Sequence, residues 1–176
     1  KFFVYTFLGS LFILAAFLLL WTEARTWSLP ALTQIDWSLS QKAKWVPWLL
    51  LIGFAIKIPV VPVHTWLPWA HVQAPAPVSM LLAAVLLKMG VYGLLRFLLG
   101  LFPTFVAEQS LLLMGLGLVN IFWGSFCALA QNDLKRLIAY SSVAHMGFCL
   151  LGLGAQNQMG VMGAALQMFN HGICSA

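Results

Sequence analysis

Two lysines stand in apolar parts of this sequence. Lys57 comes near the end of one apolar segment, and Lys88 lies well inside the next. An ammonium group at membrane depth is costly, so a lysine found there is by default a functional candidate. An apolar medium disfavours the charged form of an amine, and a neighbouring charge can then switch its protonation. Both lysines are therefore candidates for a pathway that moves charge or protons; the alternative is a purely structural role.

Two histidines could extend such a pathway, because imidazole titrates near neutrality and can pass protons. His145 lies within AYSSVAHMGF, and Ser141 precedes it by one helical turn, where side chains can meet. His171 lies within QMFNHGICS, with Gln167 one turn before it. This spacing predicts a hydrogen-bonded polar line inside membrane segments. The alternative is that these side chains only hold helices together.

The composition places these residues in a lipid bilayer. Hydrophobic residues make up 62% of the chain and charged residues only 7%, with a mean hydropathy of +0.94. A soluble domain carries about 25% charged residues. Since a spanning helix needs about 20 apolar residues, we predict an all-α, polytopic transmembrane helix bundle, a single domain over 1–176. Its six helices are predicted at 2–21, 46–67, 78–101, 109–130, 134–154 and 158–176.

The second predicted helix contains a break. Pro59 and Pro62 follow Lys57 within it, and each proline removes a backbone donor and clashes with the preceding turn. Freed carbonyls in a bilayer must be satisfied by neighbours or water, so a broken helix beside an ionisable residue favours a hydrated site. A structural kink is the alternative. His64 and His71 flank the connection that follows, and they are accessory candidates, either proton shuttles or interfacial residues.

The connecting segments indicate the membrane interface but not the orientation of the chain. Tryptophans gather around the connection 22–44, as in an interfacial aromatic belt, and this connection has room for a short surface helix. Asp133 is predicted to cap the helix that follows it. Basic residues divide almost evenly between the two sides, with Arg25, Lys42, Lys44 and Arg96 on one and Lys1, Lys135 and Arg136 on the other.

Three segments carry a family resemblance. The sequences KIPVVPVHTWLPWAHVQAPAPVSMLLAAVLLKMGVYGLLRF, NDLKRLIAYSSVAHMGF and LQMFNHGICSA resemble the antiporter-like membrane subunits of respiratory complex I. They are most similar to the NADH dehydrogenase subunit 4 type, called the M subunit in bacteria and the D subunit in the cyanobacterial and plastid enzymes. The resemblance covers nearly the whole chain. It implies a fragment of a larger antiporter-like fold, with further helices on both sides.

The resemblance also implies a function and site residues. It implies a proton-translocating subunit of an NADH:quinone, or plastoquinone-type, oxidoreductase of an electron transport chain. By it, Lys57 corresponds to the lysine of the broken helix, Lys88 to the central connecting lysine, and His145 and His171 to the histidines of a hydrophilic axis.

The cofactors and partners implied lie outside this chain. NAD(P)H or ferredoxin, FMN, iron–sulfur clusters and quinone are expected in partner subunits, with no cofactor or metal here. The partners are the other membrane and peripheral subunits of a complex I-type assembly, with no nucleic acid. The expected location is the bacterial inner membrane, or the thylakoid or mitochondrial inner membrane.

The chain departs from the family pattern at one place. Residues 67–71 read Leu-Pro-Trp-Ala-His where the family usually has Leu-Pro-Asp-Ala-His, and Gln73 stands where many members have glutamate. Trp69 and Gln73 therefore remove negative charge near His71 and leave both lysines unchanged. Other functions remain open: a subunit of a multisubunit cation/proton antiporter or of a membrane-bound hydrogenase, or a passive membrane scaffold.

Overall fold

The chain is built from α-helices, and the longest of these helices coincide with apolar segments of the sequence. The computed structural model describes residues 1–37 and 44–175. Lys42, counted above among the basic residues, lies outside the described residues, as does the last residue of the final predicted helix. No strand occurs in the part of the chain that is described, which confirms the all-α class. The helices are α1 (Phe2–Ala24), α2 (Leu29–Leu32), α3 (Val46–Lys57), α4 (Trp66–Gln73), α5 (Ala76–Leu81), α6 (Leu87–Gly93), α7 (Pro103–Glu108), α8 (Ser110–Leu129), α9 (Leu134–Gly154) and α10 (Gln158–Ser175).

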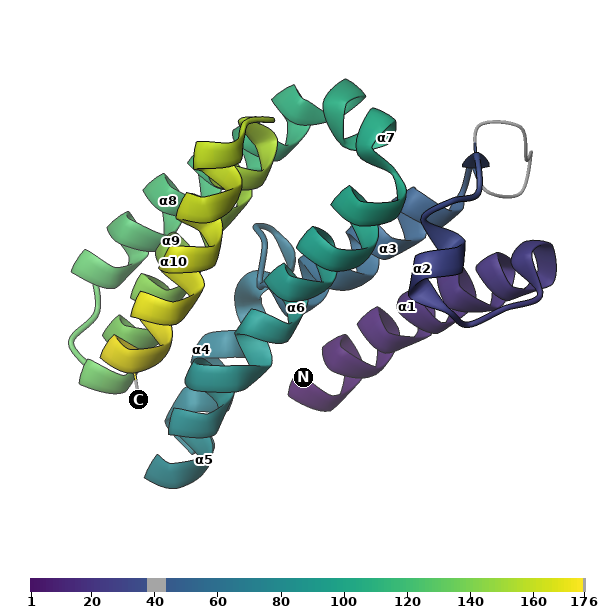
Figure 1. Cartoon of the computed structure of the whole chain (residues 1–176). Helices are drawn as coiled ribbons and strands as arrows, with labels where there is room; N and C mark the ends of the chain where they lie inside the picture. The colour runs from purple at the N-terminus through teal and green to yellow at the C-terminus, as the bar shows by residue number, and fades with distance from the viewer. Residues whose placement is uncertain (38–43, 176) are drawn as a thin grey trace.

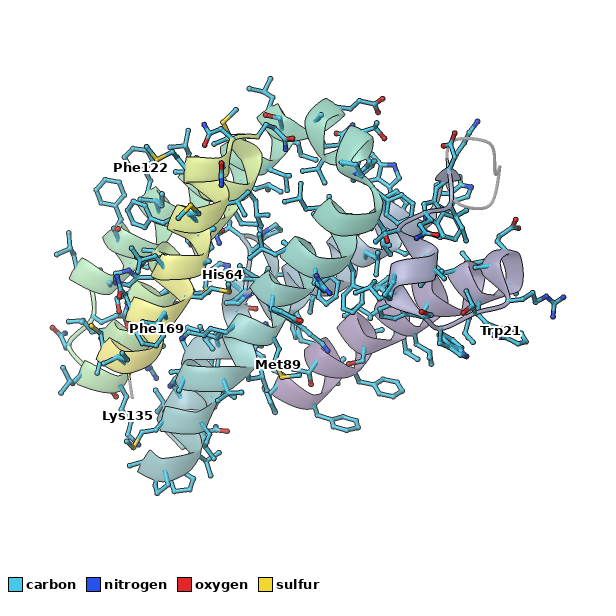
Figure 2. The ribbon with its side chains drawn as sticks, in the orientation of Figure 1. Trp21, His64, Met89, Phe122, Lys135 and Phe169 are labelled. Atoms are coloured by element: carbon cyan, nitrogen blue, oxygen red, sulfur yellow. The ribbon has the colours of Figure 1, made fainter. Side chains whose placement is uncertain are left out.

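The helices collect in two groups with a middle layer between them. Figure 1 shows α8, α9 and α10 side by side at one end of the molecule and α1 with α3 at the other. Between these groups run α4 and the helix that contains α5 and α6; α4 packs against α9, and α3 packs against α6. Large apolar side chains such as Phe122 and Phe169 project from the outer faces (Figure 2). Such faces suit lipid, because the hydrocarbon core offers no polar partners.

Four helices among the described residues are long and apolar enough to cross a membrane: α1, the continuous helix Ala76–Leu99, α8 and α9. At about 1.5 Å per residue, α1 extends roughly 34 Å, more than the roughly 30 Å of a hydrocarbon core. Two predicted segments form no such helix. The segment 46–67 is split by its break, and the 18-residue α10 carries polar side chains along its length.

The break in the second predicted helix lies where the prolines predict it. α3 ends at Lys57, and the chain turns through residues 58–62 before a short 3₁₀ turn leads into α4. The predicted end of this segment at residue 67 is wrong, because the chain stays helical to Gln73. Pro68 does not stop α4, since it falls in the first turn, where backbone N–H groups have no helical partner. His71 therefore belongs to a helix and not to a connection.

The helix that carries Lys88 is regular except for two widened turns. Ala76–Leu99 runs as one helix, but π turns at Leu82–Leu86 and Leu94–Leu99 bracket α6. Such turns occur often at functional sites. Here they place Lys88 in a short, regular stretch between two local irregularities.

Close contacts between helices depend on glycines. A Cβ added to Gly117 in α8 would lie 2.8 Å from the carbonyl oxygen of Gly147, and one added to Gly147 in α9 would lie 2.6 Å from the carbonyl oxygen of Gly117. The two backbones therefore touch, as small residues allow in membrane helices. In α6, a Cβ on Gly90 would lie 2.6 Å from Cγ1 of Ile58. This contact holds α6 directly against the break.

A short helix occupies part of the first connection, and Asp133 caps α9 as the sequence predicts. α2 lies in the connection 22–44, where the sequence leaves room for a short surface helix without requiring one. The carboxylate of Asp133 caps α9, accepting hydrogen bonds from the backbone N–H groups of Lys135 (2.8 Å) and Arg136 (3.4 Å). Lys135 marks this end of the molecule in Figure 2.

Candidate proton pathway

Lys88 and His171 form the centre of the candidate site. Lys88 is half-buried, and its Nζ donates to the carbonyl oxygen of Ala83, one π turn earlier in the same helix. The same Nζ lies 2.5 Å from Nδ1 of His171 in α10. His171 is buried, with 4% of its surface exposed. The structure thus brings together two predicted site residues that are far apart in the sequence.

The hydrogen bonds around His171 have a defined direction. When Lys88 is protonated, its ammonium has donors and no acceptor, so Nδ1 of His171 accepts from it. A neutral imidazole then carries its proton on Nε2, which lies 3.0 Å from Oγ of Ser142. The Ser142 hydroxyl in turn donates to the carbonyl oxygen of Ile138 at 3.0 Å. The resulting order, Lys88 to His171 to Ser142, is a hydrogen-bonded line across three helices.

His145 lies beside this line. The ring centroids of His145 and His171 are 5.2 Å apart, and the rings are tilted by 53°. Nδ1 of His145 lies 2.8 Å from Nε2 of Gln167; an amide nitrogen only donates, so this Nδ1 accepts. Gln167, predicted as a neighbour of His171, therefore pairs with His145 across the α9–α10 interface.

The serine predicted beside His145 forms no hydrogen bond with it among the described residues. The hydroxyl of Ser141 donates to the carbonyl oxygen of Ile138 at 2.8 Å and stays within its own helix. The next residue, Ser142, is fully buried and reaches His171. Both serines stand in the run AYSSVAHMGF, but only the way α9 packs against α10 decides which of them faces inward.

Lys57 lies at the last residue of α3, beside the break. It is half-buried, and no hydrogen-bond partner for its amine is seen among residues 1–37 and 44–175. A Cβ on Gly90 would lie 3.4 Å from Cβ of Lys57. Lys57 therefore packs against α6 two residues from Lys88, although no hydrogen bond joins the two lysines.

His64 and His71 are buried, with 6% and 3% of their surfaces exposed. Nδ1 of His71 lies 2.6 Å from Oγ of Ser79. Nδ1 of His64 and Nε2 of His71 have no hydrogen-bond partner among residues 1–37 and 44–175, although buried polar atoms are normally satisfied by protein or water. His64 lies between the helix groups (Figure 2), with its ring centroid 6.3 Å from that of Tyr140. No hydrogen bond among the described residues joins either histidine to Lys88.

Two further residues serve the break and were not predicted. Nε1 of Trp66 donates to the carbonyl oxygen of Ile56 at 2.9 Å. Oδ1 of Asn120 in α8 accepts from the backbone N–H of Val61 at 2.7 Å. The sequence offers one signal for Asn120, since it is a carboxamide inside the apolar run GLGLVNIFWG.

Trp69, one of the departures from the family pattern, lies near two positively charged side chains at one end of the molecule. Nζ of Lys1 lies 5.1 Å and Cζ of Arg136 lies 5.7 Å from the centroid of a Trp69 ring. Both distances allow cation–π attraction. The aromatic face of Trp69 thus lies close to two cations.

Lys88 also borders an open groove. The groove holds about 470 Å³ between the Lys88 helix and α10, and Tyr92, Met168 and Phe169 contribute to its walls. No group of three or more histidine, cysteine or acidic side chains within residues 1–37 and 44–175 could hold a metal ion. The side chains that line the groove are mostly apolar, so Lys88 is the feature there that can do chemistry.

A helix broken beside one lysine, and a second lysine hydrogen-bonded to a histidine of a neighbouring helix, are features that fit an antiporter-like membrane protein. The chain belongs to the family described as NADH:quinone oxidoreductase/Mrp antiporter, whose transmembrane family model matches residues 1–176. The protein is therefore an integral membrane protein of this family.

Individual relatives agree with this assignment. The chain is 44% identical over 179 residues to NADH-quinone oxidoreductase subunit M of Rickettsia prowazekii (strain Madrid E), a match over 100% of this chain and 36% of that protein. It is 48% identical over 180 residues to NAD(P)H-quinone oxidoreductase chain 4 of Prochlorococcus marinus (strain AS9601), covering 100% of this chain and 33% of that one. A chain of respiratory complex I from Thermus thermophilus superposes with a TM-score of 0.84 at 33% identity, over 99% of this chain and 38% of that chain. The chain thus spans about a third of the length of the curated relatives it matches.

Proposed function

We propose that this chain is part of a proton-translocating membrane subunit of an NADH:quinone, or plastoquinone-type, oxidoreductase. The family and the names of the relatives support this. NAD(P)H or ferredoxin, FMN, iron–sulfur clusters and quinone belong to partner subunits, which carry the redox chemistry. The host is a bacterial inner membrane, or a thylakoid or mitochondrial inner membrane. The role of this chain is to move protons.

The contact between Lys88 and His171 is the observation that carries the proposal. With Lys88 protonated, its ammonium donates to Nδ1 of His171. Transfer moves one proton from Nζ to Nδ1, leaving a neutral amine and an imidazolium. Because these atoms are already within hydrogen-bond distance, no rearrangement of helices is needed for this step.

The proton continues from His171 toward His145. The two rings lie 5.2 Å apart between centroids, so a small ring rotation or a bridging water completes the step. Ser142 and Gln167 each hold one imidazole nitrogen and so orient the two rings. They are positioning residues, and His145 and His171 are carriers.

Lys57 sets the charge near Lys88. Like charges on neighbouring helices disfavour one another, so a positive Lys57 favours release of the proton from Lys88. Pairing of Lys57 with a carboxylate elsewhere in the assembly removes that effect and lets Lys88 load again. His64 and His71, each with a buried nitrogen that has no hydrogen-bond partner in the described part of the chain, are accessory carriers that would use water.

Antiport of cations and protons is the second candidate function, because the family description also covers Mrp antiporters. The relatives that are 44% and 48% identical bear quinone oxidoreductase names, which favours the first proposal. Sodium-dependent transport by an assembly without quinone reductase activity would favour the antiporter instead.

The test uses Lys88→Met in the intact enzyme with the full-length subunit. We expect assembly to be preserved while proton pumping and electron transfer both fall by about tenfold or more, because the loading step is lost. Lys44→Met is the matched control, since Lys44 is exposed in a connection, and it should leave both rates unchanged. If Lys88→Met and Lys57→Met assemble and pump at the full rate, the lysines are structural and the chain is a passive scaffold.

A further inference from the structure

The break between α3 and α4 exposes backbone groups that need partners. Pro59 and Pro62 have no N–H, and the turn they cause removes regular helical bonding from their neighbours. Val60 recovers one bond by donating to the carbonyl oxygen of Ala55 at 3.0 Å. Val61 bonds instead to a side chain of another helix, Asn120. In a bilayer such a partner is required, because water is scarce there.

Asn120 meets both kinds of backbone group with one carboxamide. Oδ1 accepts from the N–H of Val61 at 2.7 Å, and Nδ2 donates to the carbonyl oxygen of Pro59 at 3.5 Å. Asn120 is fully buried, with 0% of its surface exposed. The amide therefore spans the break, replacing bonds that a continuous helix would make within itself.

The opposite side of Asn120 rests on the helix that carries His145. A Cβ added to Gly147 would lie 3.0 Å from Cβ of Asn120, so Asn120 packs directly on the α9 backbone. Gly147 follows His145 by two residues. The Asn120 side chain thus contacts both the break that follows Lys57 and α9, the helix that carries His145.

We propose that Asn120 is a positioning residue that holds the break in register with α9 and so links the position of Lys57 to that of His145. This role rests on the proposed function, because it assigns Asn120 to the same proton pathway. Asn120 carries no proton itself. Without its carboxamide, the N–H of Val61 and the carbonyl of Pro59 must find other partners, and the break can do so only by changing shape or by admitting water.

The first measurement is hydrogen exchange at the Val61 amide in the intact purified complex, by mass spectrometry of the 56–67 segment. Asn120→Leu keeps a similar size and loses both hydrogen bonds, and exchange should become about tenfold faster. Asn120→Asp keeps an oxygen acceptor for Val61 and loses the donor to Pro59, so the exchange rate at Val61 should stay closer to wild type than in Asn120→Leu. Asn170→Leu, an exposed asparagine in α10, is the matched control and should change nothing at this segment.

The second measurement is the number of protons pumped per electron in the same preparations. Asn120→Leu should lower this ratio at least twofold while electron transfer persists. If the Val61 amide exchanges at the wild-type rate in Asn120→Leu, Asn120 does not hold the break. If exchange is faster but the number of protons pumped per electron is unchanged, the break is not linked to pumping through Asn120. If Asn120→Leu does not assemble, Asn120→Ser, whose hydroxyl is too short to span the break, takes its place with the same expectations.

Failure of the proposed function gives a different pattern. If Lys88→Met pumps at the full rate, the proton pathway is wrong, whatever the Asn120 variants do. If Lys88→Met abolishes pumping and Asn120→Leu leaves both exchange and pumping unchanged, only the role of Asn120 is wrong.

Discussion

Replacing Ser142 by alanine tests the centre of the site with the least structural change. The Ser142 hydroxyl is fully buried and accepts from Nε2 of His171 at 3.0 Å. His171 is itself 4% exposed. In Ser142→Ala the Nε2–H group keeps its burial and loses its acceptor, so the variant leaves one unpaired donor in the core of the pathway.

The expected cost follows from that unpaired donor. A buried hydrogen-bonding group left without a partner costs about 1–3 kcal/mol. If about 1.4 kcal/mol of this cost destabilises the ring orientation that His171 adopts in the wild type, that orientation becomes about tenfold less populated. We therefore expect proton pumping to fall several-fold to tenfold, with normal assembly, because a single hydroxyl is removed.

Ser141→Ala is the matched control. Ser141 is the neighbouring residue, and its hydroxyl also donates to the carbonyl oxygen of Ile138, at 2.8 Å. It lacks the contact with His171, so its loss should change stability by no more than about 0.5 kcal/mol. Both variants are compared in inverted membrane vesicles by dye-detected acidification alongside NADH-driven electron transfer.

Two results would refute this reasoning. If the two serine variants lose the same amount of pumping, the effect belongs to the shared bond with Ile138 and not to His171. If neither variant loses pumping activity, the Ser142–His171 hydrogen bond does not orient the ring during turnover. The line of hydrogen bonds from Lys88 through His171 to Ser142 then does not contribute to pumping.

Two further predictions concern the break. Gly90→Ala places a Cβ 2.6 Å from Cγ1 of the fully buried Ile58, and overpacking of this kind costs about 1–3 kcal/mol, so less intact complex should survive heating on native gels; Gly115→Ala, with open space around it, should match wild type. Trp66→Phe removes the donor to the carbonyl oxygen of Ile56 and should cost about 1–2 kcal/mol by the same heating assay, whereas an unchanged survival would mean that water replaces the indole.

The features that the sequence could predict are those set by local chemistry. Hydropathy over about 20 residues identifies α1, α8 and α9 because bilayer thickness sets the length. The prolines after Lys57 predict the break, since a missing N–H acts on its own turn. Asp133 is predictable as a cap for the same reason. Each of these depends on residues within a few positions of one another.

The features that the sequence could not predict depend on how helices face one another. Successive residues of a helix point about 100° apart, so Ser141 and Ser142 differ only in which face meets α10. The pairing of Gln167 with His145, and of Asn120 with Val61, joins residues on different helices. A polar residue in an apolar helix predicts that some partner exists, and packing decides which one.

The surroundings of Lys88 suit a proton relay better than they would if its ammonium were paired with a carboxylate. Its acceptors are the Ala83 carbonyl and a neutral imidazole, and the four acidic residues of the chain all stand at helix ends or in connections. A carboxylate partner would hold the proton on the amine by direct attraction. Neutral acceptors satisfy the ammonium without the direct attraction of an anion, so in the proposed pathway a change of charge at Lys57 would shift the proton to His171. In the proposed pathway, the absence of an acid from the described contacts of Lys88 therefore allows the proton to leave.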